Sequence, residues 1–338
     1  MKAVAVLGAG SWGTALAAHA GRAGHEVRLW ARNPALVDEM IARRTNAVYL
    51  PGIELPASVR PEGSLRAALA DAGLVISAIP SHGTRAVMRA AAPFISPHAI
   101  VVSATKGLEG GALLRISEVI EQELGGSGRV AVLSGPSFAA EVARELPTAV
   151  CVAAADPEVA ASVQTELRGR HFRLYASTDV IGVEIGGALK NVIAIAAGVV
   201  EGLGLGHNAL AALITRGLAE VTRLACAVGA RRETLSGLTG LGDLVLTCTG
   251  TLSRNRHVGI ELARGRPLAE ILSGMKMVAE GVATTTAALA LGQRYGVELP
   301  IAAQMAEVLA GRREPSAGVE ELMLRRQRPE PEADGRMN

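Results

Sequence analysis

The first half of the chain alternates short β-branched runs with amphipathic segments, and this rhythm constrains the fold more than any other feature. Helical patterns occupy residues 14–24, 33–44, 84–95, 113–124 and 157–167. Apolar runs of strand length lie between them and begin at Ala3, Glu26, Leu74, Ala99, Val130 and Thr148. Such alternation predicts βαβ units, whose parallel strands form one sheet covered by helices on both faces. A further run at 172–177 is predicted to end the sheet.

The rhythm stops at about Thr178, and the chain from there to Gly311 is predicted to be almost entirely helical. With 338 residues, of which 49% are hydrophobic, the chain is long enough for about two domains. We therefore expect an α/β domain at 1–177, with a mostly parallel sheet, and an all-helical domain at 178–326. Residues 327–338 are charged and proline-rich without apolar periodicity, so we expect a disordered tail there.

Composition excludes several classes of protein. The formal net charge is only +2, the charges are interspersed and aromatic residues make up 2%, so we expect no nucleic-acid partner. Cys151, Cys226 and Cys248 lack metal-ligand spacing, so we expect no metal site and a reducing compartment. No signal peptide is apparent, and the apolar stretch between Lys190 and Glu201 is shorter than the roughly 18 residues of a membrane span. These features predict a soluble cytoplasmic protein without membrane insertion.

The sequence VAVLGAGSWGTALA places Gly8, Gly10 and Gly13 directly after the first strand and at the start of a helix. The spacing GxGxxG alone is weak in a chain with 39 glycines, and an ordinary strand-to-helix turn remains an alternative. The context is more specific, because the glycines open a unit of roughly 30 residues that ends in a second strand. In that setting they allow a tight turn and close approach of a pyrophosphate. A Rossmann-type dinucleotide site is predicted.

The second strand ends in LWARN, without the carboxylate that would hold the ribose hydroxyl of NAD. Arg32 instead offers a guanidinium where a 2′-phosphate would lie. We therefore predict that NADP is accepted and preferred, and that NAD is the second cofactor. The alternative is that Arg32 is an ordinary solvated surface residue.

Lys190 lies within EIGGALKNVIAIAAG, which otherwise has the pattern of a buried helix. Its helical neighbours are small, namely Gly186, Gly187, Ala194 and Ala197. Small residues let another backbone or a flat ligand approach, and they leave the amine in a confined pocket. Desolvation and a second cation would lower its pKa toward the range of a general base. The alternative is a lysine whose stem covers apolar surface while its head reaches water.

Three other segments carry candidate ligand groups. Lys106 follows a strand at the sheet edge where ligands bind, and it supplies a second cation. The segment LSGPSFAAE from Leu133 also ends a strand, with Ser137 either capping a helix or contacting a ligand. The segment from Leu238 to Gly259 gathers hydroxyls, an amide and a guanidinium that suit a phosphorylated, hydroxylated substrate, although it is also compatible with a surface loop.

Together these segments resemble the bacterial form of the NAD(P)-dependent glycerol-3-phosphate dehydrogenase family. The resemblance extends from Met1 to about Leu324 and implies reversible reduction of dihydroxyacetone phosphate to sn-glycerol 3-phosphate, which supplies glycerophospholipid synthesis. It also implies a homodimer through the helical domain. The motifs that carry it are GAGSWGTALA, SATKGL, LSGPSFAAEV, EIGGALKNVIAIAAG, GLGDLVLTC, SRN and VAEGVATT.

The resemblance also implies roles for particular residues. Lys190 matches the general acid and base, with Lys106 and Asn191 holding the reacting oxygen. Trp12 stands where the family often has phenylalanine or tyrosine, so an aromatic ring is kept. Substrate contacts are implied for Lys106, Gly135, Ser137, Lys190, Asn191, Asp243, Ser253, Arg254 and Asn255. Cofactor contacts are implied for Gly8, Gly10, Ser11, Trp12, Gly13, Arg32, Lys106, Ala139, Arg254, Val278 and Glu280.

Two other functions are compatible with parts of this pattern. A related dehydrogenase acting on a hydroxy acid would need a cation for a carboxylate, but not the SRN cluster directed at a phosphate. A protein that binds NADP to regulate a partner would be free to lose Lys106, Lys190 and Asp243, and all three are present. Catalysis on a phosphorylated substrate therefore remains the preferred hypothesis.

Overall fold

The strand runs of the first half form one eight-stranded sheet in the computed structural model of this protein, which describes residues 3–126 and 129–327. The sheet order is β10-β9-β8-β7-β6-β1-β2-β5, so β10 forms one edge as predicted. The strands are β1 (Ala3–Leu7), β2 (Glu26–Trp30), β5 (Val59–Glu62), β6 (Leu74–Ser77), β7 (Ile100–Ser103), β8 (Arg129–Ser134), β9 (Thr148–Ala153) and β10 (Phe172–Ser177).

The sheet is mostly parallel, as expected, with one antiparallel junction between β8 and β9. Strands β9 and β10 are parallel to each other and so run opposite to the rest. The central strands are buried on both faces, which explains their uninterrupted apolar sequences. Helices of this unit are α1 (Ser11–Arg22), α2 (Pro34–Arg43), α3 (Leu65–Leu69), α4 (Ser81–Ala91), the short 3-10 turn η1 (Ala92–Phe94), α5 (Ile116–Glu123), α6 (Ala139–Ala143) and α7 (Pro157–Leu167).

The elements between Thr45 and Glu62 were not predicted from the sequence. A two-stranded antiparallel sheet pairs β3 (Thr45–Asn46) with β4 (Leu50–Glu54), and β5 adds an edge strand beside β2. The sequences LPGIE and VRPE contain proline or glycine and show no clear alternation. Proline is tolerated in edge strands, where one side of the ladder needs no partner, and this explains why a sequence pattern for central strands missed them.

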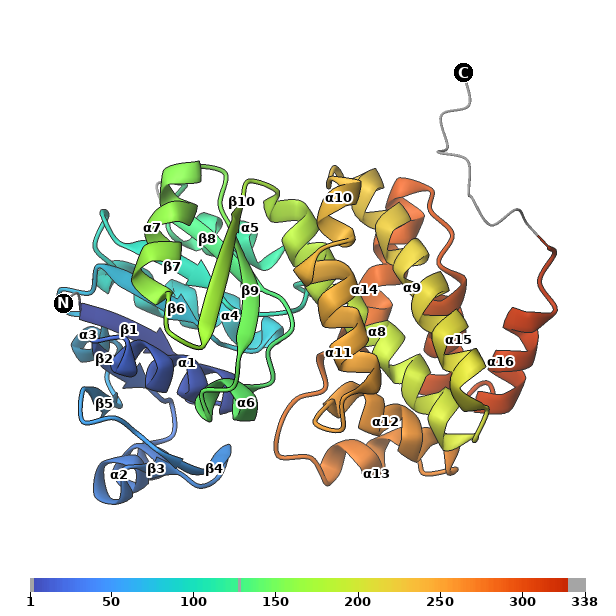
Figure 1. Ribbon diagram of the computed structural model, residues 1–338, viewed down its shortest axis with the longest axis horizontal. Helices are drawn as coiled ribbons and strands as arrows, with labels where there is room; N and C mark the ends of the chain where they lie inside the picture. Colours follow the sequence, from blue (N-terminus) through green and yellow to red (C-terminus); the bar gives the residue numbers. More distant parts are fainter. Residues whose placement is uncertain (1–2, 127–128, 328–338) are drawn as a thin grey trace.

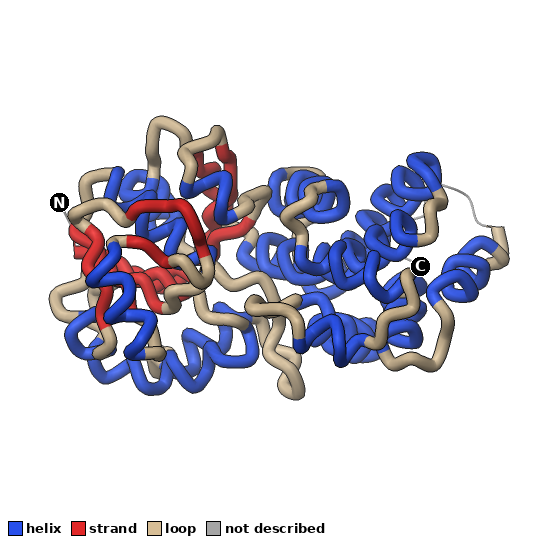
Figure 2. Tube along the Cα trace, turned by 90° about the horizontal axis from the view of Figure 1, so that it is seen from below, coloured by secondary structure: helices blue, strands red, loops and turns tan. Residues whose placement is uncertain are grey.

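The second half is helical, as expected. Figure 1 shows the sheet unit and the helical unit side by side, and Figure 2 shows all strands at one end of the molecule. Strand β10 ends at Ser177 and α8 begins at Val180. The elements are α8 (Val180–Gly202), α9 (Gly206–Val228), α10 (Arg232–Leu235), the π-helical turn η2 (Leu238–Gly242), α11 (Asp243–Thr249), α12 (Arg254–Ala263), α13 (Leu268–Ser273), α14 (Glu280–Tyr295), α15 (Pro300–Leu309) and α16 (Pro315–Met323). Apart from Gln327, the expected tail lies outside the described residues.

Helix α8 is the centre of the helical unit, and α9, α11, α12 and α14 pack around it. The sequence predicted that the apolar stretch of α8 is too short for a membrane span, and this prediction is wrong. Helix α8 has 23 residues and an 18-residue window of mean hydropathy 1.6, so its length and composition alone would allow it to span a membrane. However, 89% of that window is buried inside the protein. Packing of this kind is typical of the core helix of a soluble protein.

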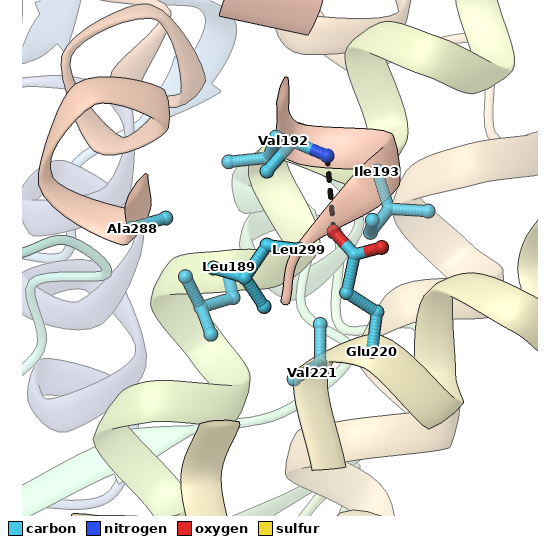
Figure 3. Close-up of a pocket in the computed structure, with 8 residues that line it drawn as sticks. Leu189, Val192, Ile193, Glu220, Val221, Ala288 and Leu299 are labelled. Carbon is cyan, nitrogen blue, oxygen red and sulfur yellow. Dashed lines mark hydrogen bonds between the residues drawn. The ribbon is translucent and has the colours of Figure 1, made fainter. Parts of the chain in front are cut away.

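Glu220 on α9 is buried and anchors the start of α15. Its carboxylate accepts hydrogen bonds from Ile301 N at 2.9 Å and Ala302 N at 3.0 Å, beside a small apolar cavity lined by Leu189, Val192 and other apolar side chains (Figure 3). Burial raises the pKa of Glu220 to about 7, against the backbone hydrogen bonds that lower it. Folding therefore favours proton uptake between the ordinary pKa near 4.5 and about 7.

We expect Glu220→Gln to flatten the pH dependence of stability. Protonated Glu220 contributes stability that is fully present below pH of about 4.5 and lost as pH rises through about 7, whereas glutamine stays neutral throughout. A shift of one pKa unit corresponds to about 1.4 kcal/mol. Between pH 5 and 8, the free energy of unfolding of wild type should therefore fall by up to about 3 kcal/mol relative to that of the variant. Urea unfolding at both pH values measures it, with exposed Glu26→Gln as control. Parallel behaviour of wild type and Glu220→Gln would contradict the expectation.

Candidate active site

The turn between β1 and α1 has the close packing that the three glycines predict. Gly8 has φ of +106°, and a Cβ on Gly13 would lie 1.8 Å from the Gly8 carbonyl oxygen. A Cβ on Gly10 would meet no atom within 4 Å. No side chain caps α1 at Gly10, so the first N–H groups of the helix are available to an anion. These features fit a bound pyrophosphate.

Three further residues of the sheet unit lie on or just after elements next to this turn. Arg32 is exposed two residues after the end of β2, the strand that pairs with β1. Trp12 is in the first turn of α1, and its indole Nε1 is buried without a hydrogen-bond partner among the described residues. Ala139 begins α6, which packs against α1. The adenine side of a dinucleotide would meet Arg32 if it followed the usual path across this edge.

Lys190 and Lys106 share one buried carboxylate, that of Asp243. Lys190 Nζ donates to Asp243 Oδ1 at 2.5 Å, and Lys106 Nζ donates to Asp243 Oδ2 at 2.8 Å. Asp243 is 0% exposed and Lys190 6% exposed. The three residues come from α8, the segment after β7, and the first turn of α11, which are far apart in the sequence. The fold therefore places a lysine pair and an aspartate between the sheet unit and the helical unit.

The environment of Lys190 lowers its pKa from about 10.5 to about 8. Burial is the largest cause, and the Lys106 charge adds to it, while Asp243 opposes both. The sequence-based expectation of desolvation together with a second cation is confirmed in direction. A lysine with a pKa near 8 exchanges its proton readily at neutral to mildly basic pH.

The small residues of α8 admit neighbouring groups, as predicted. A Cβ on Gly186 would lie 3.0 Å from the Thr239 carbonyl oxygen of η2, and one on Gly187 would lie 2.5 Å from Ser134 Oγ. Larger side chains at these positions would push η2 and the end of β8 away from the helix. The close approach of η2 in turn brings Asp243, the next residue of the chain, to Lys190.

The sequence placed Thr247 among the hydroxyls of the segment from Leu238 to Gly259 that suit a substrate, but it did not predict a contact with Lys190. Thr247 Oγ1 accepts a hydrogen bond from Lys190 Nζ at 2.6 Å and donates to the Asp243 carbonyl oxygen at 2.6 Å. The i, i+4 spacing of Asp243 and Thr247 is the sequence signal that could have identified it.

The loop after β8 contacts Lys106. Lys106 Nζ donates to the Gly135 carbonyl oxygen at 2.7 Å and lies 3.3 Å from Ser137 Oγ. Gly135 has φ of +130°, a conformation that favours glycine. The interpretation of Ser137 as a helix cap is wrong, because Phe138 is the N-cap of α6 and Ser137 Oγ donates to the Gly135 carbonyl oxygen at 2.8 Å. Its hydroxyl instead faces the lysine side of the site.

A chain of amides links the lysines to α14. Asn191 Nδ2 donates to the Lys106 carbonyl oxygen at 3.3 Å, and Asn255 Nδ2 donates to Asn191 Oδ1 at 2.9 Å. Gly281 N then donates to Asn255 Oδ1 at 3.0 Å. Asn191 and Asn255 are therefore brought together with Lys106.

The remaining predicted residues lie at the starts of α12 and α14. Ser253 is buried and caps α12 by accepting from Arg256 N at 3.2 Å, while Arg254 is exposed in the first turn. Val278 is 40% exposed just before α14. Glu280 reaches across to the sheet unit, where it accepts from Ser81 N at 3.0 Å and Ser81 Oγ at 2.5 Å. Sequence reasoning missed Ser81, which has no motif of its own.

Comparisons with known proteins show the family of the chain. Family models described as the N-terminus and the C-terminus of NAD-dependent glycerol-3-phosphate dehydrogenase match residues 3–160 and 179–320. A protein of Koribacter versatilis (strain Ellin345) named glycerol-3-phosphate dehydrogenase [NAD(P)+] is 54% identical over 274 residues, which are 80% of this chain and 81% of that protein. A protein of the same name from Geobacter metallireducens is 53% identical over 270 residues, 79% of this chain and 81% of its own length.

A solved structure leads to the same family. The crystal structure of glycerol-3-phosphate dehydrogenase from Coxiella burnetii superposes with a TM-score of 0.92 at 42% sequence identity, and the match covers 96% of this chain and 99% of that one. With both family models matched and relatives above 50% identity over most of the length, the chain belongs to the NAD-dependent glycerol-3-phosphate dehydrogenase family.

Proposed function

We propose that this protein interconverts dihydroxyacetone phosphate and sn-glycerol 3-phosphate by hydride transfer with NADP(H) or NAD(H). The observation that carries the proposal is the buried cluster in which Lys190 and Lys106 share Asp243, because it holds an amine of lowered pKa beside a fixed positive charge. Relatives that are more than 50% identical carry the corresponding name. The product would supply glycerophospholipid synthesis.

In the reduction, Lys190 would donate its proton to the oxygen of the substrate carbonyl as that oxygen gains negative charge. Asp243 and Thr247 hold the Lys190 ammonium in place. Lys106 would stabilise the developing charge electrostatically. In the reverse reaction, the neutral amine of Lys190 would accept the proton of the substrate hydroxyl, which its pKa of about 8 allows.

The substrate phosphate would bind at the start of α12. Arg254 is exposed there and can form bidentate hydrogen bonds to phosphate oxygens, with Ser253 and Asn255 beside it. Gly135, Ser137 and Asn191 would contact the substrate near Lys106. This cluster favours a phosphorylated substrate over a hydroxy acid that carries only a carboxylate.

The dinucleotide would be held by the turn after β1. Gly10 would leave room for the pyrophosphate, Gly8 and Gly13 allow the tight packing of the turn, and the N–H groups of Ser11 and Trp12 would face the pyrophosphate. When bound, the nicotinamide supplies the hydride for reduction and accepts it in the reverse direction. Further cofactor contacts are proposed for Arg32, Lys106, Ala139, Arg254, Val278 and Glu280.

The organisation of the chain follows from these roles. Residues 1–177 would form the dinucleotide-binding domain and residues 178–326 the substrate-binding domain, with the site between them. We further propose a soluble cytoplasmic enzyme, without nucleic-acid partner or membrane insertion, that forms a homodimer through the helical domain.

Absorbance at 340 nm, with purified protein, dihydroxyacetone phosphate and NADPH or NADH in parallel, tests the reaction. We expect rapid oxidation of NADPH, and competition by inorganic phosphate. A 2-oxo acid, the oxidised partner of a hydroxy acid, should give no rate when it replaces dihydroxyacetone phosphate. Binding of NADPH without oxidation in any of these mixtures would instead favour a cofactor sensor.

We expect Arg32→Ala to change cofactor choice. A guanidinium that pairs with the 2′-phosphate contributes about 1.5–3 kcal/mol, so kcat/KM for NADPH should fall roughly 10- to 100-fold while that for NADH changes little. Steady-state kinetics with both cofactors measure the ratio. Arg43→Ala, another arginine of the same α2 region, serves as control. An equal loss with both cofactors would mean that Arg32 does not recognise the 2′-phosphate.

A further inference from the structure

Glu184 is a buried carboxylate on α8 whose partners all come from the sheet unit. It accepts hydrogen bonds from Ser117 N at 2.8 Å, Ser117 Oγ at 2.6 Å and Arg115 Nη1 at 2.7 Å. Its side chain is 4% exposed and that of Arg115 is 17% exposed. An ion pair this deeply buried contributes little net stability by itself, whereas removing one partner leaves an uncompensated charge. The position of this ion pair in the fold is therefore more informative than its contribution to stability.

The partners of Glu184 end the same segment that carries Lys106. This segment runs from β7 to α5, and Arg115 is the N-cap of α5. It folds back on itself, because Leu108 pairs with Arg115 in an antiparallel bridge and Glu109 N donates to the Leu114 carbonyl oxygen at 2.9 Å. Holding Arg115 in place therefore also holds Leu108, two residues after Lys106.

Helix α8 contacts this segment at a second place. Glu184, Gly187 and Asn191 have the i, i+3, i+7 spacing of one helix face. Asn191 Nδ2 donates to the Lys106 carbonyl oxygen at 3.3 Å, and a Cβ on Gly187 would lie 3.7 Å from Lys106 Cγ. The helix that carries Lys190 thus holds the Lys106 segment at both ends of a stretch of about two turns, with the lysine stem passing over a glycine between them.

We propose that Glu184 is a positioning residue, which by anchoring Arg115 and Ser117 keeps Lys106 where it shares Asp243 with Lys190. The inference rests on the proposed function, since it concerns the geometry of the same lysine pair. The titratable groups that act on Lys190 are Asp243 and Cys248 from α11 and Lys106 from this segment. Of these, only Lys106 is tied to Glu184. Releasing the anchor should move Lys106 away and so raise the pKa of Lys190 from about 8.

The test is Glu184→Gln in the full-length protein, because glutamine keeps the shape and can accept from Ser117 but removes the buried counter-charge of Arg115, which then keeps its ion pair with the more exposed Glu118 at 3.0 Å. A misplacement of about 1 Å can cost up to about 10²-fold in rate, so we expect kcat for reduction to fall about 10-fold. The basic limb of the kcat profile should move to higher pH. Glu220→Gln is the matched control, because it also neutralises a buried glutamate of the helical unit, one that anchors α15 instead. It should keep the wild-type kcat and the wild-type limb.

A double-mutant cycle separates positioning from general destabilisation. If Glu184 acts through Lys106, Glu184→Gln should cost nothing further in a Lys106→Met background. An equal additional loss in that background, or a wild-type kcat and pH limb in the single variant, would overturn the proposal. If Glu184→Gln does not fold, Ser117→Ala removes one hydrogen bond to Glu184 and should give a smaller change in the same direction.

Hydrogen exchange provides a readout that does not depend on activity. Glu184→Gln should speed exchange of the backbone amides at 106–117, while Glu220→Gln should leave them unchanged. Unchanged exchange in Glu184→Gln would overturn the proposal. If wild type itself shows no reduction of dihydroxyacetone phosphate, the proposed function fails, and exchange still decides whether Glu184 anchors the segment.

Discussion

Replacing Lys190 with alanine should lower kcat by at least about 10²-fold, the contribution typical of a general acid, while the Kd for NADPH stays close to that of wild type. The reason is that Lys190 holds the proton exchanged with the substrate oxygen, whereas the dinucleotide turn lies on the sheet unit. Stability should change little, because Asp243 keeps its ion pair with Lys106 at 2.8 Å. Stopped-flow kinetics and a fluorescence titration of NADPH measure the two quantities.

The pH profile adds a second criterion to the Lys190 experiment. With a pKa of about 8, wild type should lose the reduction as pH rises through 8, because the ammonium is then deprotonated, and should gain the oxidation over the same interval. Lys190→Arg keeps the charge but cannot release its proton in this range, so it should be as slow as the alanine variant. Turnover near that of wild type in either variant would contradict the assignment.

Asp243→Ala should destabilise the protein by about 3–5 kcal/mol, the usual cost of leaving a buried charge without its partner. Two ammonium groups would then face each other without the carboxylate that lies 2.5 Å from one and 2.8 Å from the other. Asp243 is also the main group that raises the pKa of Lys190 against burial, so its loss should lower that pKa below about 8. Reduction at neutral pH would fall for lack of a protonated acid. Urea unfolding and the pH profile measure both effects.

The Asp243 experiment has two controls. Asp156→Ala removes a carboxylate that caps α7 on the surface and should cost only about 1 kcal/mol, with unchanged kinetics. Added formate can enter the space left in Asp243→Ala and should restore part of the rate, since it returns a negative charge to the lysine pair. A stable, active Asp243→Ala protein would show that the two lysines do not need the shared carboxylate.

The sequence correctly predicted those helices and strands in which all residues favour the same secondary structure. The central strands have uninterrupted β-branched runs because both of their faces are buried, and α8 has an apolar surface all round for the same reason. The direction of β9 was not predictable, because the same apolar run pairs equally well in parallel or antiparallel. Edge strand β5 was not predicted, because an exposed edge tolerates the proline of VRPE, which is atypical of strands.

The sequence by itself therefore determined the class of fold, the glycine turn that fits a pyrophosphate, and Lys190 as a lysine with small neighbours on a buried helix. Only the tertiary structure decided that Lys190, Lys106 and Asp243 meet, that Thr247 completes the contacts of Lys190, and that Ser137 faces Lys106 instead of capping a helix. The physical reason is the separation along the sequence over which each kind of interaction acts. Backbone propensity and helical periodicity act over a few residues, whereas the hydrogen bond between Lys106 and Asp243 joins residues 137 positions apart and depends on how the helical unit packs against the sheet.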